Sequence, residues 1–139
     1  MSKVAVKEEK DVVVERTPQV IAAEIRQIDS QARQFVLQSA IEIGSRLHEA
    51  KALVPHGSWG KWLRENVNYS QSTANNFMRI AEEYGHANLQ ALGNISYTQA
   101  VALLALPAEE REQFVADHNV AKMSSRELQA AIKEKQELE

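Results

Sequence analysis

The sequence predicts an all-α fold in which a long N-terminal helix packs on a helix-turn-helix core, followed by short helices. Apolar residues recur at spacings of three and four from residue 17 onward, and Ser, Thr and Pro stand where helices would begin. No segment shows the strict apolar–polar alternation of a half-buried strand. We predict a disordered arm over residues 1–16, a long helix over 17–57, a helix-turn-helix over 58–85 and supporting helices over 86–139.

The arm is charged and has no apolar periodicity, so we expect it to be disordered. A short apolar run at residues 12–14 leaves open a strand that pairs only in an oligomer. Thr17 and Pro18 then combine an N-cap residue with a proline at the first helical position, which predicts a helix start.

The long helix is expected to reach about Val54, before a Pro-His-Gly segment at residues 55–57 ends it. The spacing of its apolar residues is close to a heptad repeat, and the apolar stripe shifts by one residue at the middle of the helix, as in a coiled-coil stutter. The first stripe is Ile21, Ile25, Ile28, Ala32 and Phe35; the second is Val36, Ala40, Ile43, Leu47, Ala50 and Val54. The helix either lies across the domain or pairs with a second copy, and Asp29-Ser30 could divide it in two. Gly44 either allows close helix packing or only weakens the helix.

The predicted helix-turn-helix begins with a short helix from Trp59 to about Asn66, for which Ser58 is the expected cap. After a turn at residues 67–69, Ser70 caps a second helix over residues 71–84, and Gly85 is expected to close it in the left-handed conformation. One face of this helix must be buried: Ala74, Phe77, Met78, Ala81 and Tyr84. The other face carries Ser72, Asn75, Asn76, Arg79 and Glu83.

Four further helical segments are expected downstream. Residues 87–92 form a short turn, Ser96 caps a helix to about Ala105, and Pro107 opens another to about Asp117. Ser124 and Glu127 have the spacing of a capping box for a last helix over residues 125–138.

Charge is unevenly distributed along the chain, although the net charge is only -3. Residues 44–79 hold five bases and two acids, a net of +3, whereas residues 80–139 hold five bases and ten acids, a net of -5. The positive charge therefore lies in one block of the sequence, from the end of the long helix to Arg79.

The polar face of the second helix has the chemistry that reads DNA. A major groove admits an α-helix, Asn and Gln can pair with adenine, Arg with guanine, and Ser or Thr with either. A helix N-terminus favours phosphate, and cations on the preceding helix set the register on the backbone. The expected contacts to double-stranded DNA are Lys61, Arg64, Tyr69, Ser70, Gln71, Ser72, Thr73, Asn75, Asn76 and Arg79.

Two alternatives stand beside this interpretation. The amides and hydroxyls could form an ordinary solvated face, although surface helices usually prefer stronger helix formers. The fold could also be the scaffold of a protein-interaction adaptor whose acidic C-terminal half binds a basic partner. We expect Trp59 and Trp62 to pack in the core and not to stack on bases, and Tyr69 suits either packing or a phosphate contact.

We expect no enzyme, cofactor, metal or small-molecule substrate. The chain has no cysteine, which excludes disulfides and thiolate chemistry, and its four histidines lack metal-binding spacing. No apolar run is long enough for a membrane helix, and we expect a cytoplasmic protein. A single reading head has limited contact area, so a homodimer on paired half-sites is expected, joined by the long or the last helix.

The first half of the chain resembles an uncharacterised bacterial family, domain of unknown function 3102. The similar segments are residues 40–44 (AIEIG), Leu47, residues 54–63 (VPHGSWGKWL) and residues 69–74 (YSQSTA). The resemblance implies an origin in phages, plasmids or conjugative elements and no known activity.

The second half resembles the DNA-binding region of ParB-type partition proteins. The similar segments are residues 95–96 (IS), Ala100, residues 102–104 (ALL), 106–107 (LP), 123–124 (MS), 126–128 (REL) and Lys133. The resemblance implies that residues 100–107 support the reading head by packing. The arginine-rich nucleotide-binding box of that family is absent, so CTP binding and clamp sliding are not implied.

Overall fold

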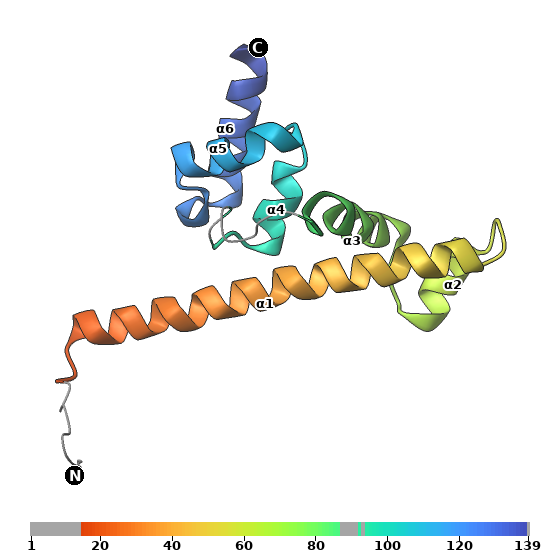
Figure 1. Ribbon diagram of the computed structural model, residues 1–139, viewed down its shortest axis with the longest axis horizontal. Helices are drawn as coiled ribbons and strands as arrows, with labels where there is room; N and C mark the ends of the chain where they lie inside the picture. Colours follow the sequence, from red (N-terminus) through yellow and green to blue (C-terminus); the bar gives the residue numbers. More distant parts are fainter. Residues whose placement is uncertain (1–14, 87–91, 93, 139) are drawn as a thin grey trace, which may run out of the picture. The chain divides into compact units, whose positions relative to one another are not determined.

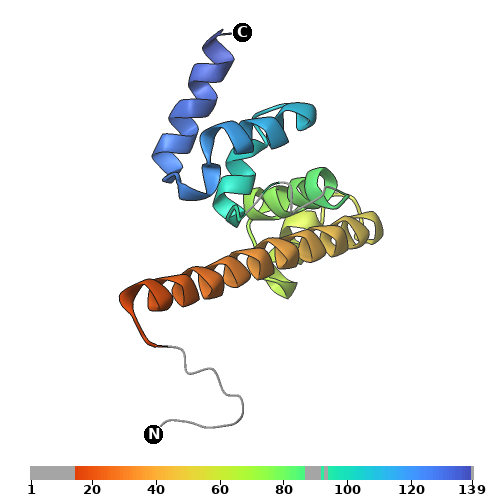
Figure 2. The same cartoon turned by 60° about the vertical axis from the view of Figure 1, so that its left-hand side comes forward.

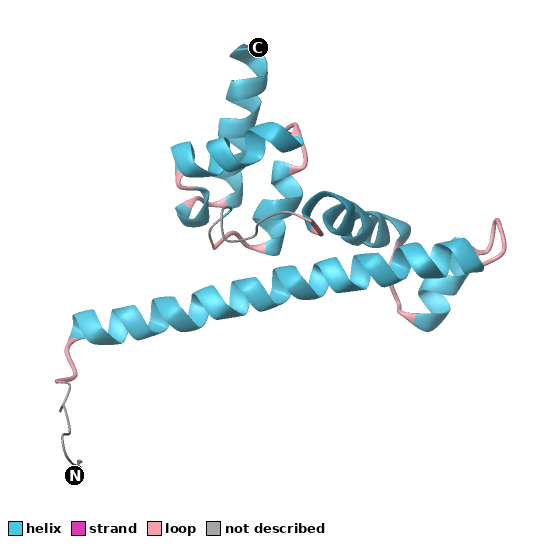
Figure 3. Cartoon of the chain, viewed as in Figure 1, coloured by secondary structure: helices cyan, strands magenta, loops and turns pink. Residues whose placement is uncertain are grey.

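The computed structural model describes residues 15–86, 92 and 94–138, and the elements found there are helical, as Figure 3 shows. In chain order they are α1 (Pro18–Leu53), α2 (Trp59–Asn66), α3 (Gln71–Tyr84), α4 (Tyr97–Leu103), α5 (Ala108–His118), a 3₁₀ turn (Val120–Lys122) and α6 (Ser125–Leu138), labelled in Figure 1. The described residues contain no strand. The predicted all-α class is confirmed.

The chain divides into two compact units, Met1–Gln31 and Ala32–Glu139. Helix α1 is continuous from Pro18 to Leu53, so Asp29-Ser30 does not split it. The Thr17 hydroxyl oxygen accepts the backbone N–H of Val20 at 3.1 Å, which confirms the predicted cap. Of the predicted N-terminal arm, residues 1–14 lie outside the described residues.

In the larger unit, the second half of α1 buries Leu37, Ala40, Gly44 and Leu47. These residues recur at spacings of three and four and form one narrow face. The second apolar stripe is therefore shifted from the prediction at its start, because Val36 is half exposed and Leu37 is buried instead. The adjacent residue points about 100° further round the helix, into the core.

Helices α1 and α3 cross at Gly44 with almost no space between their backbones. A Cβ built on Gly44 would lie 1.9 Å from the Phe77 carbonyl oxygen and 2.8 Å from the Ala81 Cβ. Nearby, Nε2 of His48 lies 3.2 Å from the Met78 carbonyl oxygen. Of the two roles open to Gly44, the structure shows the first, close helix packing.

Helices α2 and α3 and the turn between them adopt the predicted helix-turn-helix order (Figure 2). The Leu63 carbonyl accepts the N–H groups of Val67 and Asn68 at 3.0 and 2.7 Å, and Asn68 is left-handed with φ 58°. Asn tolerates that conformation better than most residues. The turn therefore closes over the end of α2 and redirects the chain into α3.

Two predicted helix ends differ from the structure. Ser58 occupies the N-cap position of α2 but makes no side-chain capping bond, because its backbone is not in the extended conformation that aims the hydroxyl at the helix. Gly85 is right-handed, with φ -60°, so it does not close α3 in the left-handed form. Among the described glycines, Gly57 is left-handed, with φ 89°, in the turn after α1.

Helices α4, α5 and α6 begin at the positions that the sequence predicted. Ser96 and Gln99 form a capping box at α4, and Ser124 and Glu127 form one at α6. Helix α4 ends at Leu103, two residues before the expected end, and α5 begins directly after Pro107. The expected turn over residues 87–92 lies outside the described residues except for Leu92, which is buried.

The main core joins α1, α3 and the helices that follow them, with α4 and α6 in contact. Ala100, Leu103, Leu104 and Leu106 are buried in it, which agrees with the supporting role expected for residues 100–107. A second cluster lies under the helix-turn-helix, where Leu47 of α1 meets Leu63, Ala74 and Met78. The two clusters together hold the inner face of α3.

A buried arginine ties α3 to α4 and α5. The Arg111 guanidinium donates to the Leu103 carbonyl oxygen at 3.0 Å and to a Glu83 carboxylate oxygen at 2.8 Å, and it lies 5.6 Å from the centre of the Tyr84 ring. Burial raises the pKa of Tyr84 to about 12, and its hydroxyl donates to the Ala100 carbonyl at 2.8 Å. The bonds from Arg111 to the Leu103 carbonyl and from Tyr84 to the Ala100 carbonyl satisfy buried polar groups, whereas the Glu83 carboxylate is partly exposed.

We predict that Gly44→Ala lowers the free energy of unfolding by about 1–3 kcal/mol, because the new methyl group meets the rigid backbone of Phe77. Urea unfolding followed by circular dichroism measures the change. Gly60→Ala in α2 is the matched control: its Cβ meets the flexible end of Gln71, which can move aside. The control is expected to be neutral or to gain up to about 1 kcal/mol of helix propensity. Equal stability of the two variants would contradict the close crossing.

We also predict that Arg111→Leu lowers the free energy of unfolding by about 1–3 kcal/mol, because it leaves the Leu103 carbonyl without its donor. Glu83→Gln is expected to cost less, about 1 kcal/mol at most, since the carboxylate side chain is 36% exposed. Chemical denaturation of both variants gives the comparison. A larger loss for Glu83→Gln would show that the ion pair, and not the buried carbonyl, dominates.

Candidate nucleic-acid interface

The outer face of α3 carries a polar ridge, which we define as Ser72, Asn75, Asn76 and Arg79. Ser72, Asn75 and Arg79 are exposed, and Asn76 is half buried. The opposite face of the helix is held in the core by Ala74, Met78, Ile80 and Tyr84. The predicted division of α3 into buried and exposed faces is therefore observed, and Ile80 is an additional buried residue that the prediction omitted.

Some polar groups in the first turn of α3 already take part in hydrogen bonds that cap the helix. The Ser70 hydroxyl oxygen accepts the N–H of Thr73 at 3.0 Å and donates to the Thr73 hydroxyl at the same distance. The Gln71 side chain lies over Gly60, with Nε2 2.6 Å from the position a Cβ would take there. Ser70 and Thr73 therefore serve the helix start, and Gln71 is an exposed residue resting on α2.

Arg79 is the only charged residue between Glu65 and Glu82. One of its guanidinium nitrogens lies 3.5 Å from the Leu104 carbonyl oxygen, a long contact at the end of α4. The side chain nevertheless remains exposed. A weak bond of this length can be exchanged for a stronger contact to a ligand.

Two cations of α2, Lys61 and Arg64, are exposed and belong to the helix that precedes the ridge. Two acids follow the ridge at the far end of α3. Glu83 is engaged by Arg111, and Glu82 lies 3.5 Å from Nε2 of His48. From α2 to the ridge, Lys61, Arg64 and Arg79 therefore face a single acid, Glu65, and two further acids lie at the end of α3.

The aromatic residues of the helix-turn-helix pack instead of projecting outward. Trp59 and Trp62 stack with their ring centres 5.5 Å apart and lie against the cluster around Leu63. Tyr69 is half buried, 5.3 Å from the Phe77 ring. Of the two roles left open for Tyr69, the structure shows packing.

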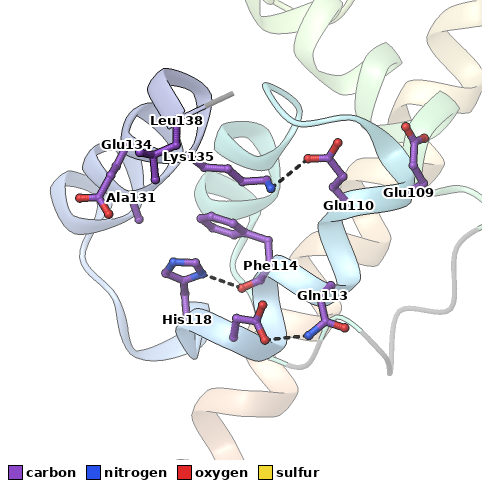
Figure 4. A pocket seen from close by; sticks show the side chains of 10 residues that line it. Glu109, Glu110, Gln113, Phe114, His118, Ala131, Glu134, Lys135 and Leu138 are labelled. Carbon is purple, nitrogen blue, oxygen red and sulfur yellow. Dashed lines mark hydrogen bonds and ion pairs between the residues drawn. The ribbon is translucent and has the colours of Figure 1, made fainter.

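A groove of about 510 Å³ lies between α5 and α6, as Figure 4 shows. Apolar groups from Phe114, Ala131 and Leu138 line it, and its other lining residues include four acids: Glu109, Glu110, Asp117 and Glu134. Lys135 crosses from α6 to Glu110 at 3.2 Å. The groove therefore combines apolar surface with net negative charge.

Arg111 and the groove were not found by the sequence reasoning. Arg111 stands in an acidic stretch, and nothing in its neighbours marks it as buried. The groove depends on how α5 lies against α6, which spacing along the chain does not specify. Glu83 belongs to the predicted polar face, but its pairing with Arg111 gives it a structural role.

The described residues contain neither a metal-binding group of side chains nor a membrane-spanning helix. No three His, Asp or Glu side chains there are grouped as a metal ion would require. Among the described helices, none combines the length and the apolar character that crossing a membrane requires.

Comparison with known proteins identifies a family for the chain. No curated protein and no solved structure matches the chain significantly. A family model described as a protein of unknown function, DUF3102, matches residues 16–135, which include all the described helices apart from the last residues of α6. Because the match covers most of the sequence, this chain belongs to the DUF3102 family of proteins of unknown function.

Proposed function

We propose that this protein binds double-stranded DNA sequence-specifically through its helix-turn-helix, with α3 in a major groove. The observation that carries the proposal is the exposed polar ridge on a helix whose other face is buried in two clusters. A helix anchored in this way presents side chains in a fixed orientation, which base readout requires.

The chemistry of the ridge suits base edges. Asn75 and Asn76 have the paired donor and acceptor that adenine matches, and Arg79 has the fork that guanine matches. Lys61 and Arg64 are placed one helix earlier, where cations contact the phosphate backbone and set the register. Ser70, Gln71, Ser72 and Thr73 lie at the N-terminus of α3, an end that favours a phosphate.

The biological setting is part of the same proposal. The resemblance of the later helices to the DNA-binding region of ParB-type partition proteins supports DNA as the partner. We propose in addition that the protein comes from a phage, plasmid or conjugative element and acts in transcription control, partition or replication. We propose a cytoplasmic homodimer that reads paired half-sites, since the contact area of one reading head is limited.

We expect enrichment of random duplexes by the full chain, followed by sequencing, to yield a motif. Asn75→Ala and Arg79→Ala should each weaken binding about tenfold or more and relax the motif, because a bidentate base contact is worth about 1–3 kcal/mol. Lys61→Ala should weaken binding to all sequences and lower the slope of affinity against salt by about one.

Arg126→Ala, which removes an exposed arginine of α6, is the matched control and should bind like the wild type. Circular dichroism of each variant checks that the fold is kept. Recovery of no motif, or equal losses for Arg79→Ala and Arg126→Ala, would contradict the proposal.

The groove between α5 and α6 favours a second candidate, a protein-interaction adaptor. A groove with apolar lining and acidic residues fits an amphipathic helix with basic side chains, the helix-in-groove mode of recognition. The acidic C-terminal half of the chain agrees with such a partner.

We predict that a synthetic helix with leucines on one face and lysines on the other binds the wild type in fluorescence anisotropy. Asp117→Lys with Glu134→Lys should abolish this binding, because both residues line the groove. Glu112→Lys with Glu137→Lys changes the net charge equally at exposed positions that do not line it. Equal losses in the two double variants would mean general charge attraction and count against the adaptor.

A further inference from the structure

The first unit of the chain exposes an apolar helix face. Its described residues, 15–31, contain a single helical segment, the beginning of α1. Ile21, Ile25 and Ile28 are exposed by 39%, 59% and 66% although they are large and apolar. Soluble proteins rarely leave such residues together in water without a partner.

The spacing of these residues specifies the kind of partner. Ile21, Ile25 and Ile28 stand four and three apart, and Ala32 and Phe35 continue the same alternation along the sequence. This is the seam of a coiled coil, in which side chains of one helix fit between those of another helix with the same repeat. A second copy of this chain supplies a helix with the same repeat. Binding to a curved or flat protein surface would not require this spacing of apolar residues.

We propose that the first half of α1 pairs with the same segment of a second copy, as an antiparallel two-helix coiled coil centred between Ile25 and Ile28. The pairing requires no nucleic acid. It goes beyond the proposed DNA binding by assigning the dimer to this face of α1.

The orientation follows from side-chain chemistry. In a parallel pair, Glu24 of one copy would lie beside Asp29 of the other, and two acids in these flanking positions repel. Arg16 of the same chain pairs with Glu24 at the surface, where water screens the pair, so this pairing reduces the repulsion without reversing it. In the antiparallel pair, Glu24 lies beside the partner's Gln31 and Asp29 beside the partner's Ala22. Isoleucine at both seam positions of parallel helices also favours three or more strands over two. In the antiparallel arrangement Ile25 faces the partner's Ile28.

Sedimentation equilibrium of the full chain without DNA tests the pairing. We expect the wild type to show a concentration-dependent equilibrium between one and two subunits, and Ile25→Glu with Ile28→Glu to remain a single subunit. Leu53→Glu is the matched control, because Leu53 is 84% exposed on the same helix but lies beyond the paired segment of residues 21–35. It should dimerise like the wild type. Urea unfolding should show that the larger unit keeps its stability in all three proteins.

A wild type that stays monomeric at every concentration, a three-subunit mass, or an unchanged dimer in the double variant would overturn the proposal. None of these results would alter the DNA-binding test, which measures the ridge of α3. If Leu53→Glu weakened dimerisation as much as the double variant does, that result would also overturn the proposed pairing.

The orientation has its own test, since the natural chain contains no cysteine. Ile25→Cys and Ile28→Cys chains, mixed and oxidised, should form a disulfide that joins one chain of each kind, because seam residues that face each other bring their Cβ atoms within disulfide reach. Mass spectrometry distinguishes this product from self-linked chains. Faster self-linking of Ile25→Cys than mixed linking would indicate parallel helices and overturn the antiparallel order.

Discussion

Helices α1 and α3 approach each other at Gly44 until the Phe77 carbonyl occupies the space that a side chain would take. Around this crossing, Leu47 joins the cluster beneath the helix-turn-helix, and Leu37 and Ala40 join the main core with Ile80 and Tyr84. Close approach of two backbones increases the number of van der Waals contacts and removes freedom of rotation. The direction in which α3 presents its outer face is therefore set by a contact on its inner face.

This constraint separates the structural residues of the helix-turn-helix from those available to a ligand. Tyr69, Trp59 and Trp62 pack, and Ser70 caps α3, so they hold the unit together. Asn75 and Arg79 remain exposed, and the contact of Arg79 with the Leu104 carbonyl oxygen is a long one of 3.5 Å. The proposed readout residues are thus fewer than the set that the sequence indicated.

The acidic residues of the described structure fall into separate groups on different helices. The acids at the end of α3 are next to His48 and Arg111, and the acids of α5 and α6 gather around a groove of their own. A polyanion and a basic peptide would therefore meet residues of different helices. This arrangement permits the two proposed functions to be tested separately, because each depends on different side chains.

The sequence by itself determined the helical class, the helix starts and the polar face of α3. These features depend on local chemistry: caps at Thr17, Ser70, Ser96 and Ser124 act within a few residues, and apolar spacing repeats along one helix. The tertiary structure alone decided the role of Gly44, the burial of Arg111 and the groove between α5 and α6. Each of these depends on residues distant in sequence, and their position is set by how whole helices pack, which no local pattern encodes.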